Sequence, residues 1–346
     1  MAPGTVLDLR SDTVTKPTPA MRRAMAEAEV GDDVIDGDPT TRRLEDAVAE
    51  RLGKERALFF PSGTMANQAA IWVHTKPGTE ILLDAESHIL HWEMAAAAAL
   101  CGVQIRPVRG TTPVMQAHDL RAMLRPQSTY AADASLICLE NTHNGAGGMV
   151  TPLPALRALQ EVGRAARLPV HLDGARLWNA AVATGTSLQE LAACADTVMV
   201  SFSKGLGAPV GACLAGPAEV IAEATRVRKR FGGGMRQSGI LAAGAHHGLT
   251  HHFDRLAEDH EAATLLGQMV HGAGGAQVVP PDTNIVMIDL PAPLANEVVA
   301  RAAELGLRIT AWHDRRVRAV THLDAPITAI AEFGPRLSQV LADVLR

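Results

Sequence analysis

Short apolar runs alternate with segments of helical periodicity over the first two-thirds of the chain. The apolar runs predict buried strands at residues 57–60, 80–83, 103–108, 135–140, 169–172 and 197–200. Apolar positions spaced by three and four predict helices at residues 17–30, 40–52, 65–75, 88–100, 153–166 and 176–184. Because short apolar strands that alternate with helices form sheets covered on both faces, the pattern predicts an α/β fold with a mostly parallel sheet.

The pattern changes after Lys204. The apolar run at 210–215 follows the strand at 197–200 too closely for a crossover helix, so an antiparallel strand is predicted there. The rest of the chain is predicted as helices at 237–252, 254–272 and 294–304, strands at 284–290 and 316–320, and a last helix. This tail predicts a small α+β C-terminal domain at 251–346, after an N-terminal arm at 1–19 and a large domain at 20–250.

The composition argues against several classes of protein. The 346 residues carry a formal net charge of −5 and only 3% aromatic residues, so no nucleic-acid partner is expected. The longest apolar run, residues 94–103, is too short to cross a membrane, and no membrane partner is expected either. Four isolated cysteines predict free thiols in a reducing compartment, and no signal peptide is recognised, so a cytoplasmic protein is expected.

Three polar motifs follow predicted strands, at the edge where a parallel sheet binds its ligands. The first is Ser62-Gly63-Thr64, between a strand and a helix. The free N–H groups of a helix N-terminus, together with two hydroxyls, suit a phosphate group. A plain helix cap is the alternative interpretation.

The second motif contains Asp173 and Arg176, just after the strand at 169–172. Asp173 either caps the next helix or pairs with a protonated ring nitrogen, which needs a fixed negative charge in a dry pocket. Arg176 either forms a surface ion pair or offers its planar fork to a substrate carboxylate.

The third motif is Ser203-Lys204-Gly205, at the end of the strand at 197–200. A lysine in an apolar strand–loop context is a candidate amine nucleophile, because desolvation lowers its pKa, whereas a solvated loop lysine is the alternative. A phosphate site, an acidic partner for a ring and a reactive lysine on successive strand ends together predict a pyridoxal 5'-phosphate site.

Further motifs resemble the threonine aldolase family, within the pyridoxal-phosphate enzymes of fold type I. They include FPSGT at 60–64, ENTHN at 140–144, HLDGAR at 171–176, GGGMRQ at 232–237, and the segments at 9–17, 30–33, 38–40, 86–88 and 317–322. The resemblance covers nearly the whole chain. It implies a fold like that of aspartate aminotransferase and a homo-oligomer with shared active sites, expected to be a homotetramer.

The resemblance also implies a role for each matching residue. Lys204 would form the Schiff base, Asp173 would hold the pyridine nitrogen protonated, and His88 would stack on the ring near the substrate hydroxyl. The alternatives for His88 are a buried, hydrogen-bonded histidine or simply the start of the following helix. Phosphate binding would fall to Ser62, Gly63 and Thr64, with Arg236 of a neighbouring subunit. Residues expected to bind the substrate carboxylate are Ser11, Arg176 and Arg318, with Arg176 also beside the cofactor. Arg228, Lys229 and Arg230 are expected to be a solvated basic stretch.

The implied activity is retro-aldol cleavage of L-threonine, L-allo-threonine and related β-hydroxy-α-amino acids to glycine and an aldehyde. A lyase catalysing β-elimination with the same lysine, or a non-catalytic carrier of the cofactor, remains an alternative. No metal site is predicted. Ile35 and Tyr130 depart from the family pattern and are expected to alter the pocket around the β-carbon, which leaves the threo/erythro preference open. The sequence also leaves open whether His88, a water molecule or a phosphate oxygen is the general base.

Overall fold

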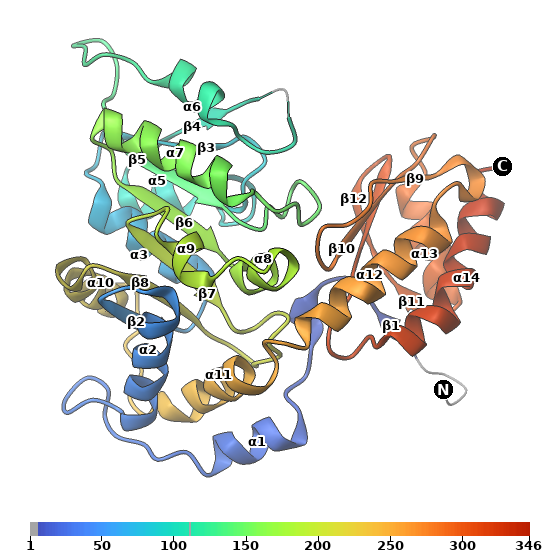
Figure 1. The fold of residues 1–346 in the computed structure, drawn as a ribbon, viewed down its shortest axis with the longest axis horizontal. Coiled ribbons are helices and arrows are strands. Elements are labelled where there is room, and N and C mark those ends of the chain that lie inside the picture. Colours follow the sequence, from blue (N-terminus) through green and yellow to red (C-terminus); the bar gives the residue numbers. More distant parts are fainter. Residues whose placement is uncertain (1–5, 111) are drawn as a thin grey trace.

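The computed structural model describes residues 6–110 and 112–346, which form a large and a small lobe (Figure 1). The large lobe contains a seven-stranded sheet in the order β2-β8-β7-β6-β5-β3-β4. Its strands are β2 (Arg56–Phe60), β3 (Glu80–Asp84), β4 (Gln104–Val108), β5 (Ala134–Glu140), β6 (Val170–Gly174), β7 (Thr197–Ser201) and β8 (Ala212–Gly216). Within this sheet β8 pairs antiparallel with β2 and β7, and the other pairings are parallel. The predicted parallel sheet and the antiparallel strand near 210–215 are confirmed.

Helices cover both faces of this sheet. Val198 and Val200 of β7 pack in a core with helices of one face, whereas Met199 between them packs in a second core on the other face. This alternation follows from the period of two in a strand. The helices are α1 (Pro19–Ala26), α2 (Pro39–Leu52), α3 (Gly63–His74), α6 (Ala117–Met123), α7 (Leu153–Ala166), α8 (Leu177–Thr184), α9 (Leu188–Ala192), α10 (Ala218–Arg230) and α11 (Gly239–His251).

The helix predicted at 88–100 is wrong as a single element. The segment forms two short helices, α4 (His88–His91) and α5 (Ala96–Cys101). Between them Met94 and Ala95 adopt positive φ angles of 54° and 55°. Such angles interrupt a right-handed helix, and the interruption lets Glu93 lie buried in the interior. The apolar period of the alanine run did not reveal this break.

The small lobe has a four-stranded antiparallel sheet in the order β12-β13-β10-β9. Its elements are β9 (Gln277–Val278), β10 (Ile285–Asp289), β12 (Thr310–His313), β13 (Arg316–Val320), α12 (Leu256–Val270), α13 (Ala295–Glu304) and α14 (Ile327–Val344). Helix α12 contributes to both lobes, because Leu256 packs in the large core and Leu266 in the small one.

The N-terminal segment also joins the lobes. Strand β1 (Leu7–Asp8) pairs in parallel with β11 (Leu307–Arg308), and Leu7 and Leu9 pack in the core of the small lobe. A short 3₁₀ helix (Asp12–Val14) follows, and α1 then packs on the large lobe near α11. The predicted arm therefore runs from one lobe to the other, and its residues 1–5 lie outside the described part.

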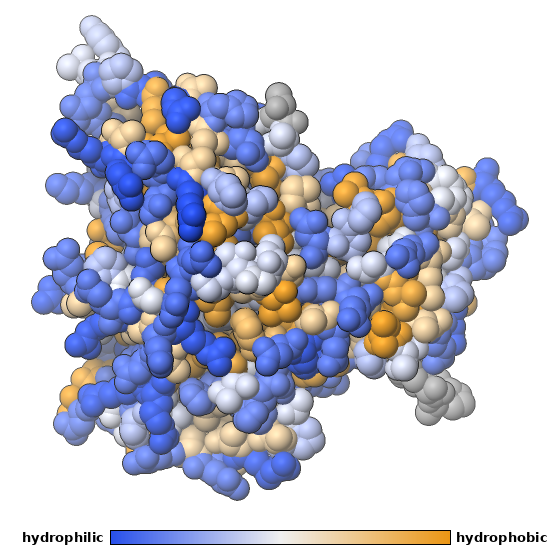
Figure 2. All heavy atoms as spheres, in the orientation of Figure 1, coloured by the Kyte–Doolittle hydropathy of each residue, from blue (hydrophilic) through white to orange (hydrophobic). Residues whose placement is uncertain are grey.

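Hydrophilic residues dominate the face seen in Figure 2, with hydrophobic patches over both lobes. Across the residues that the structure describes, no helix combines the length and the apolar character needed to span a membrane. The four cysteines are free and buried, as predicted from their isolation along the chain.

Candidate active site

A cavity of about 300 Å³ lies between the lobes, where the carboxyl ends of β5, β6 and β7 face the sheet of the small lobe. Parallel sheets bind ligands at this edge, so the cavity is where the fold predicts a site. Six residues predicted from the sequence line it: Ser11, His88, Asp173, Arg176, Lys204 and Arg318. The fold therefore brings together residues from both ends of the chain and from three strand ends.

Lys204 lies in the turn that follows β7, where its carbonyl oxygen accepts a hydrogen bond from the N–H of Gly207 (2.8 Å). Burial and the charge of Arg176 lower the pKa of the Lys204 amine, while Asp173 and other carboxylates oppose the shift. A lower pKa increases the share of neutral amine, which is the nucleophilic form. This environment favours the reactive lysine over the solvated one.

Asp173 is a buried carboxylate near the end of β6. Its Oδ1 accepts a hydrogen bond from the N–H of Ala175 (3.0 Å), and its Oδ2 accepts one from Nδ2 of Asn67 (2.9 Å). The alternative of a helix cap is wrong, because α8 begins at Leu177 with Arg176 in the cap position and no capping side chain. A buried carboxylate with neutral donors is well placed to accept a charged donor from a ligand.

Arg176 forms a bidentate ion pair with Asp12. Its Nε lies 2.8 Å from Oδ2 and its Nη2 lies 2.7 Å from Oδ1. Both side chains are buried, so the predicted alternative of a surface ion pair is wrong. Burial acts to raise the pKa of Asp12, but the charge and hydrogen bonds of Arg176 outweigh it and hold that pKa well below its ordinary value. Nη1 of Arg176 donates to Oδ1 of Asn144 (3.2 Å).

Arg318 on β13 donates from Nη1 to the same Oδ1 of Asn144 (3.1 Å). Its Nη2 donates to the carbonyl oxygen of Arg10 (3.1 Å), and the ring of Trp312 lies 4.6 Å from the guanidinium carbon. Nε is buried without a hydrogen-bond partner, and no carboxylate of the described residues lies within ion-pair distance of Arg318. Burial and the charge of Arg176 lower its pKa to about 10. Arg318 therefore presents a positive charge with no countercharge at the cavity.

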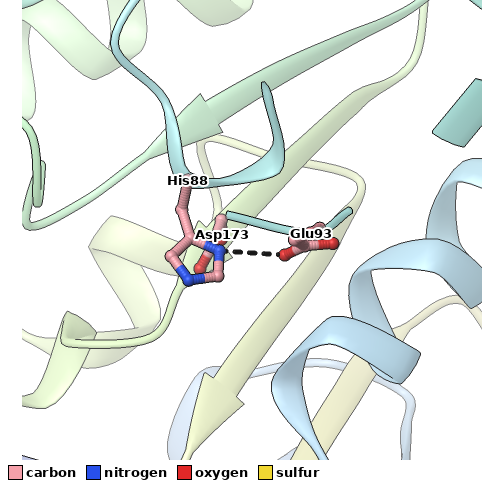
Figure 3. A group of neighbouring side chains, drawn as sticks. All are labelled: His88, Glu93 and Asp173. Atoms are coloured by element: carbon pink, nitrogen blue, oxygen red, sulfur yellow. Dashed lines mark hydrogen bonds and ion pairs between the residues drawn. The ribbon is translucent and has the colours of Figure 1, made fainter. Parts of the chain in front are cut away.

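His88 begins α4, and its backbone N–H donates to Oε2 of Glu140 (2.7 Å). Its ring Nδ1 lies 3.0 Å from Oε1 of Glu93, whose side chain is fully buried (Figure 3). Burial acts to lower the pKa of His88, but the hydrogen bond to Glu93 and the charges of Asp173 and Glu140 raise it above its ordinary value. His88 is the start of a helix, as one alternative expected, but its side chain is 34% exposed and lines the cavity, so it is not a fully buried histidine.

His88, Glu93 and Asp173 form a group in the described chain whose potential metal-ligand atoms lie within 4.8 Å of one another (Figure 3). The Nδ2 of Asn67 donates both to Glu93 (2.8 Å) and to Asp173 (2.9 Å), and Nε2 of Gln68 donates to the other oxygen of Glu93 (2.7 Å). Because these donors satisfy both carboxylates, we interpret the group as a hydrogen-bond network.

The predicted phosphate residues lie outside the cavity lining. The Oγ of Ser62 caps α3 by accepting from the N–H of Met65 (3.2 Å), so the capping interpretation holds for that side chain. Within the described residues, the N–H groups of Gly63 and Thr64 donate to no protein atom. Both precede Asn67 by about one helical turn on the same helix face, roughly 5.4 Å away. The first turn of α3 therefore offers free donors near the end of the cavity that contains Asp173.

Arg236 lies away from the cavity, with 58% of its side chain exposed and Nη1 3.2 Å from Oδ2 of Asp32. The prediction of a solvated basic stretch is wrong for Arg228, which is buried and lies 2.7 Å from Oδ2 of Asp33. Successive positions of a helix point in directions about 100° apart, so the next two residues, Lys229 and Arg230, are exposed as predicted. 

The two departures from the family pattern do not reach the cavity. Ile35 is 72% exposed and Tyr130 is 98% exposed, and neither lines the cavity. The expectation that they alter the pocket has no support within one chain, and it stays a prediction for an assembly with shared active sites. Tyr130 lies in an irregular stretch before β5.

Several residues that shape the site have no role predicted from the sequence. Asp12, Asn144 and Glu140 lie inside motifs that were recognised, and Glu93 and Trp312 lie outside them. For Glu93 the available signal was a carboxylate amid apolar neighbours. Such a residue is buried only when it is paired, and the sequence does not name the partner.

The profile of the beta-eliminating lyase family matches residues 8–293. The chain is 40% identical over 342 residues to the low specificity L-threonine aldolase of Escherichia coli strain K12, covering 97% of this chain and 100% of that protein. It is 46% identical over 274 residues to uncharacterized protein R102.4 of Caenorhabditis elegans, covering 78% of this chain and 65% of that protein. The solved threonine aldolase of Leishmania major superimposes with a TM-score of 0.80 at 19% identity, over 97% of this chain and 99% of that one. This structural similarity confirms the predicted fold class.

Proposed function

Because this chain belongs to the threonine aldolases of the beta-eliminating lyase family, we propose that it cleaves L-threonine, L-allo-threonine and related β-hydroxy-α-amino acids to glycine and an aldehyde. One observation carries the proposal. A single cavity combines the amine of Lys204, the buried carboxylate of Asp173 and the unpaired guanidinium of Arg318. An amino-acid substrate supplies a carboxylate for Arg318, whereas Lys204 and Asp173 suit the aldehyde and the ring nitrogen of a cofactor.

Members of this family are pyridoxal-phosphate enzymes, and the donor set of the chain fits that cofactor. Lys204 has the lowered pKa needed to attack an aldehyde, and Asp173 has room for a charged donor such as a pyridinium N–H. Gly63 and Thr64 offer free N–H groups for a phosphate. When bound, pyridoxal phosphate supplies a protonated ring that delocalises the electron pair left on Cα.

The side chains at the opposite end of the cavity bind and orient the amino acid. Arg318 pairs with the substrate carboxylate, and Ser11 and Arg176 line the same region. Asp12 fixes the orientation of Arg176, so the carboxylate meets a rigid set of donors. Holding the carboxylate at one end and the amine at Lys204 determines which bond to Cα is aligned for cleavage, a positioning effect.

The proposal includes an assembly in which Arg236 binds the cofactor phosphate of a neighbouring subunit, within a homotetramer. The exposed position of Arg236, outside the cavity of its own chain, supports this assignment. We also place the protein in the cytoplasm, and its four free, buried cysteines support a reducing compartment. Light scattering on the purified protein tests the number of subunits.

Product analysis tests the reaction. Purified protein loaded with pyridoxal phosphate is incubated with L-threonine and L-allo-threonine, glycine is quantified, and acetaldehyde is measured with a coupled alcohol dehydrogenase. Ammonia and a keto acid in place of these products would show a β-eliminating lyase. A spectral change without products would show a carrier.

Lys204→Ala is expected to reduce turnover by at least about 1,000-fold with the fold retained, because the variant has no amine for the cofactor aldehyde. Borohydride reduction is expected to attach the cofactor to the peptide that contains Lys204 in the wild-type protein. Lys229→Ala removes an exposed lysine and serves as the matched control. Turnover near the wild-type rate in Lys204→Ala would refute the assignment.

A further inference from the structure

Glu93 has no place in the motifs recognised in the sequence, yet its carboxylate has hydrogen-bonding contacts with three side chains. Its side chain is fully buried, at the break between α4 and α5. Oε1 accepts from Nδ2 of Asn67 (2.8 Å) and contacts Nδ1 of His88 (3.0 Å), and Oε2 accepts from Nε2 of Gln68 (2.7 Å). These three contacts hold the carboxylate in one orientation.

The orientation of the Asn67 amide follows from its neighbours. Its nitrogen contacts two carboxylates, which accept hydrogen bonds, and its Oδ1 lies 3.0 Å from Nε2 of His171. Burial lowers the pKa of His171 to about 4, so this ring is neutral and Nε2 carries its one proton. Nδ1 of His171 then accepts from the hydroxyl of Thr197, 3.0 Å away. Each group in this chain therefore has a defined role as donor or acceptor.

The same reasoning fixes the tautomer of His88. An ionised Glu93 only accepts hydrogen bonds, so Nδ1 of His88 carries a proton at the 3.0 Å contact. In the neutral ring, Nε2 then holds the free lone pair. His88 lines the cavity, and Figure 3 shows Nδ1 on the side of Glu93 and Nε2 away from it.

We propose that Glu93 is a positioning residue that fixes His88 in the Nδ1–H tautomer, so that Nε2 accepts the hydroxyl proton of the substrate. The inference deepens the proposed function and rests on it, because the hydroxyl belongs to a β-hydroxy-α-amino acid. A carboxylate behind a catalytic imidazole selects its tautomer and stabilises the imidazolium that forms.

The proton balance is complete with these groups. The hydroxyl proton moves to Nε2 of His88, and the electron pair of the O–H bond becomes the second bond of the aldehyde carbonyl. The Cα–Cβ bond breaks with its electron pair on Cα, where a proton replaces the departing aldehyde to give glycine. The positive charge that forms on His88 faces the carboxylates of Glu93, Asp173 and Glu140, while Lys204, Arg176 and Arg318 lie on the other walls of the cavity.

Replacement of Glu93 by Gln tests the proposal by its effect on pH dependence. The hydrogen bond and charge of Glu93 raise the pKa of His88, so the variant is expected to have a lower pKa at that ring. Because the base acts when deprotonated, the acid limb of the kcat profile should move to lower pH. At the same time kcat should fall by about 10- to 100-fold, since the tautomer is no longer selected.

A purely structural role would lower kcat and leave the acid limb in place, and that result would overturn the proposal. An unchanged kcat would do the same. Glu86→Gln removes a carboxylate that is 53% exposed and two residues from His88, and it is the matched control expected to leave both quantities unchanged. Glu93→Asp keeps the charge and should recover part of kcat and the wild-type position of the acid limb.

A second measurement needs neither turnover nor a folded variant at position 93. In wild-type protein with ¹⁵N-labelled histidine, the His88 signals are identified by their absence in His88→Asn. Above the pKa of His88, Nδ1 is expected to show the shift of a protonated nitrogen and Nε2 that of an unprotonated one. The opposite tautomer would overturn the proposal. If instead wild-type protein with bound cofactor released no glycine, the proposed function would fail while this tautomer test would still stand.

Discussion

Arg176 and Arg318 share one acceptor, Oδ1 of Asn144, yet their surroundings differ. Arg176 is neutralised by the bidentate contact with Asp12, a partner 164 positions away in the sequence. Arg318 has only neutral acceptors and the ring of Trp312, and its Nε has no partner. The difference indicates that Arg176 mainly holds the site in shape and that Arg318 can bind an anion.

The contrast also separates two kinds of energetic cost. Breaking a buried ion pair leaves a charge without its partner and destabilises the folded state. Removing a cation that has no countercharge weakens the binding of a ligand but leaves the stability of the fold nearly unchanged. Replacing Arg176 should therefore lower the stability of the fold more than substrate affinity. Replacing Arg318 should lower substrate affinity more than stability.

The largest effect is expected for Arg176→Gln, which leaves the carboxylate of Asp12 buried and unpaired. The free energy of unfolding should fall by about 3–5 kcal/mol. Denaturant titration followed by circular dichroism measures it. Arg164→Gln is the control, because Arg164 pairs with Glu161 on the exposed face of α7 and such pairs contribute at most about 1 kcal/mol.

A double variant sharpens this result. Asp12→Asn combined with Arg176→Gln removes both charges, so it should lose less stability than the two single variants predict together. If the stability losses of the two single variants added up strictly to that of the double variant, the ion pair would not be the reason that Arg176 stabilises the fold.

The second effect is expected for Arg318→Gln. The value of kcat/KM for L-threonine should fall by about 10- to 150-fold, since a hydrogen bond to a charged group contributes roughly 1.5–3 kcal/mol. Stability should change by less than about 1 kcal/mol. Steady-state kinetics and the same denaturant titration measure both quantities. Arg316→Gln, on the same strand but paired with Asp289, is the control for kinetics. If Arg318→Gln lost stability while its kinetics stayed unchanged, Arg318 would be a structural residue and not a substrate-binding one.

The smallest effect is expected for Trp312→Leu, which removes the ring beneath Arg318. A cation–π contact contributes about 0.5–2 kcal/mol, so KM should rise by roughly 2- to 30-fold while kcat stays near its wild-type value. Kinetics with L-threonine measure the change. Unchanged KM would show that the ring does not hold Arg318 in place.

Much of the fold could be predicted from local pattern alone. Strand β8 was predicted as antiparallel from its distance to β7, and the structure confirms it. The break between α4 and α5 could not be predicted, because Met94 and Ala95 are ordinary helix formers and their residue types do not mark the positive φ angles that they adopt. The short strands β1 and β11 were also missed, since two-residue pairings carry no period.

The site could be predicted from the sequence where the type of residue itself indicates the chemistry. Lys204, Asp173 and Arg318 follow or lie in predicted strands, and the structure places all three around the cavity. Partners were not predictable in the same way. The contact of Asp12 with Arg176 depends on which distant segments the fold brings together. The contact of Glu93 with His88 is local, but it depends on a helix break that the sequence did not reveal.

The contacts of Asp12 span nearly the whole chain, because its carboxylate bonds Arg176 and also Asn284, 272 positions later. During translation at about 5–20 residues per second, that carboxylate leaves the ribosome roughly 14–54 s before the amide it must meet. While the chain is still being translated, no partly folded intermediate therefore has a complete substrate-binding pocket. A nascent chain stalled after Lys204 but before the second lobe is complete would carry the reactive lysine and still lack a place for its substrate.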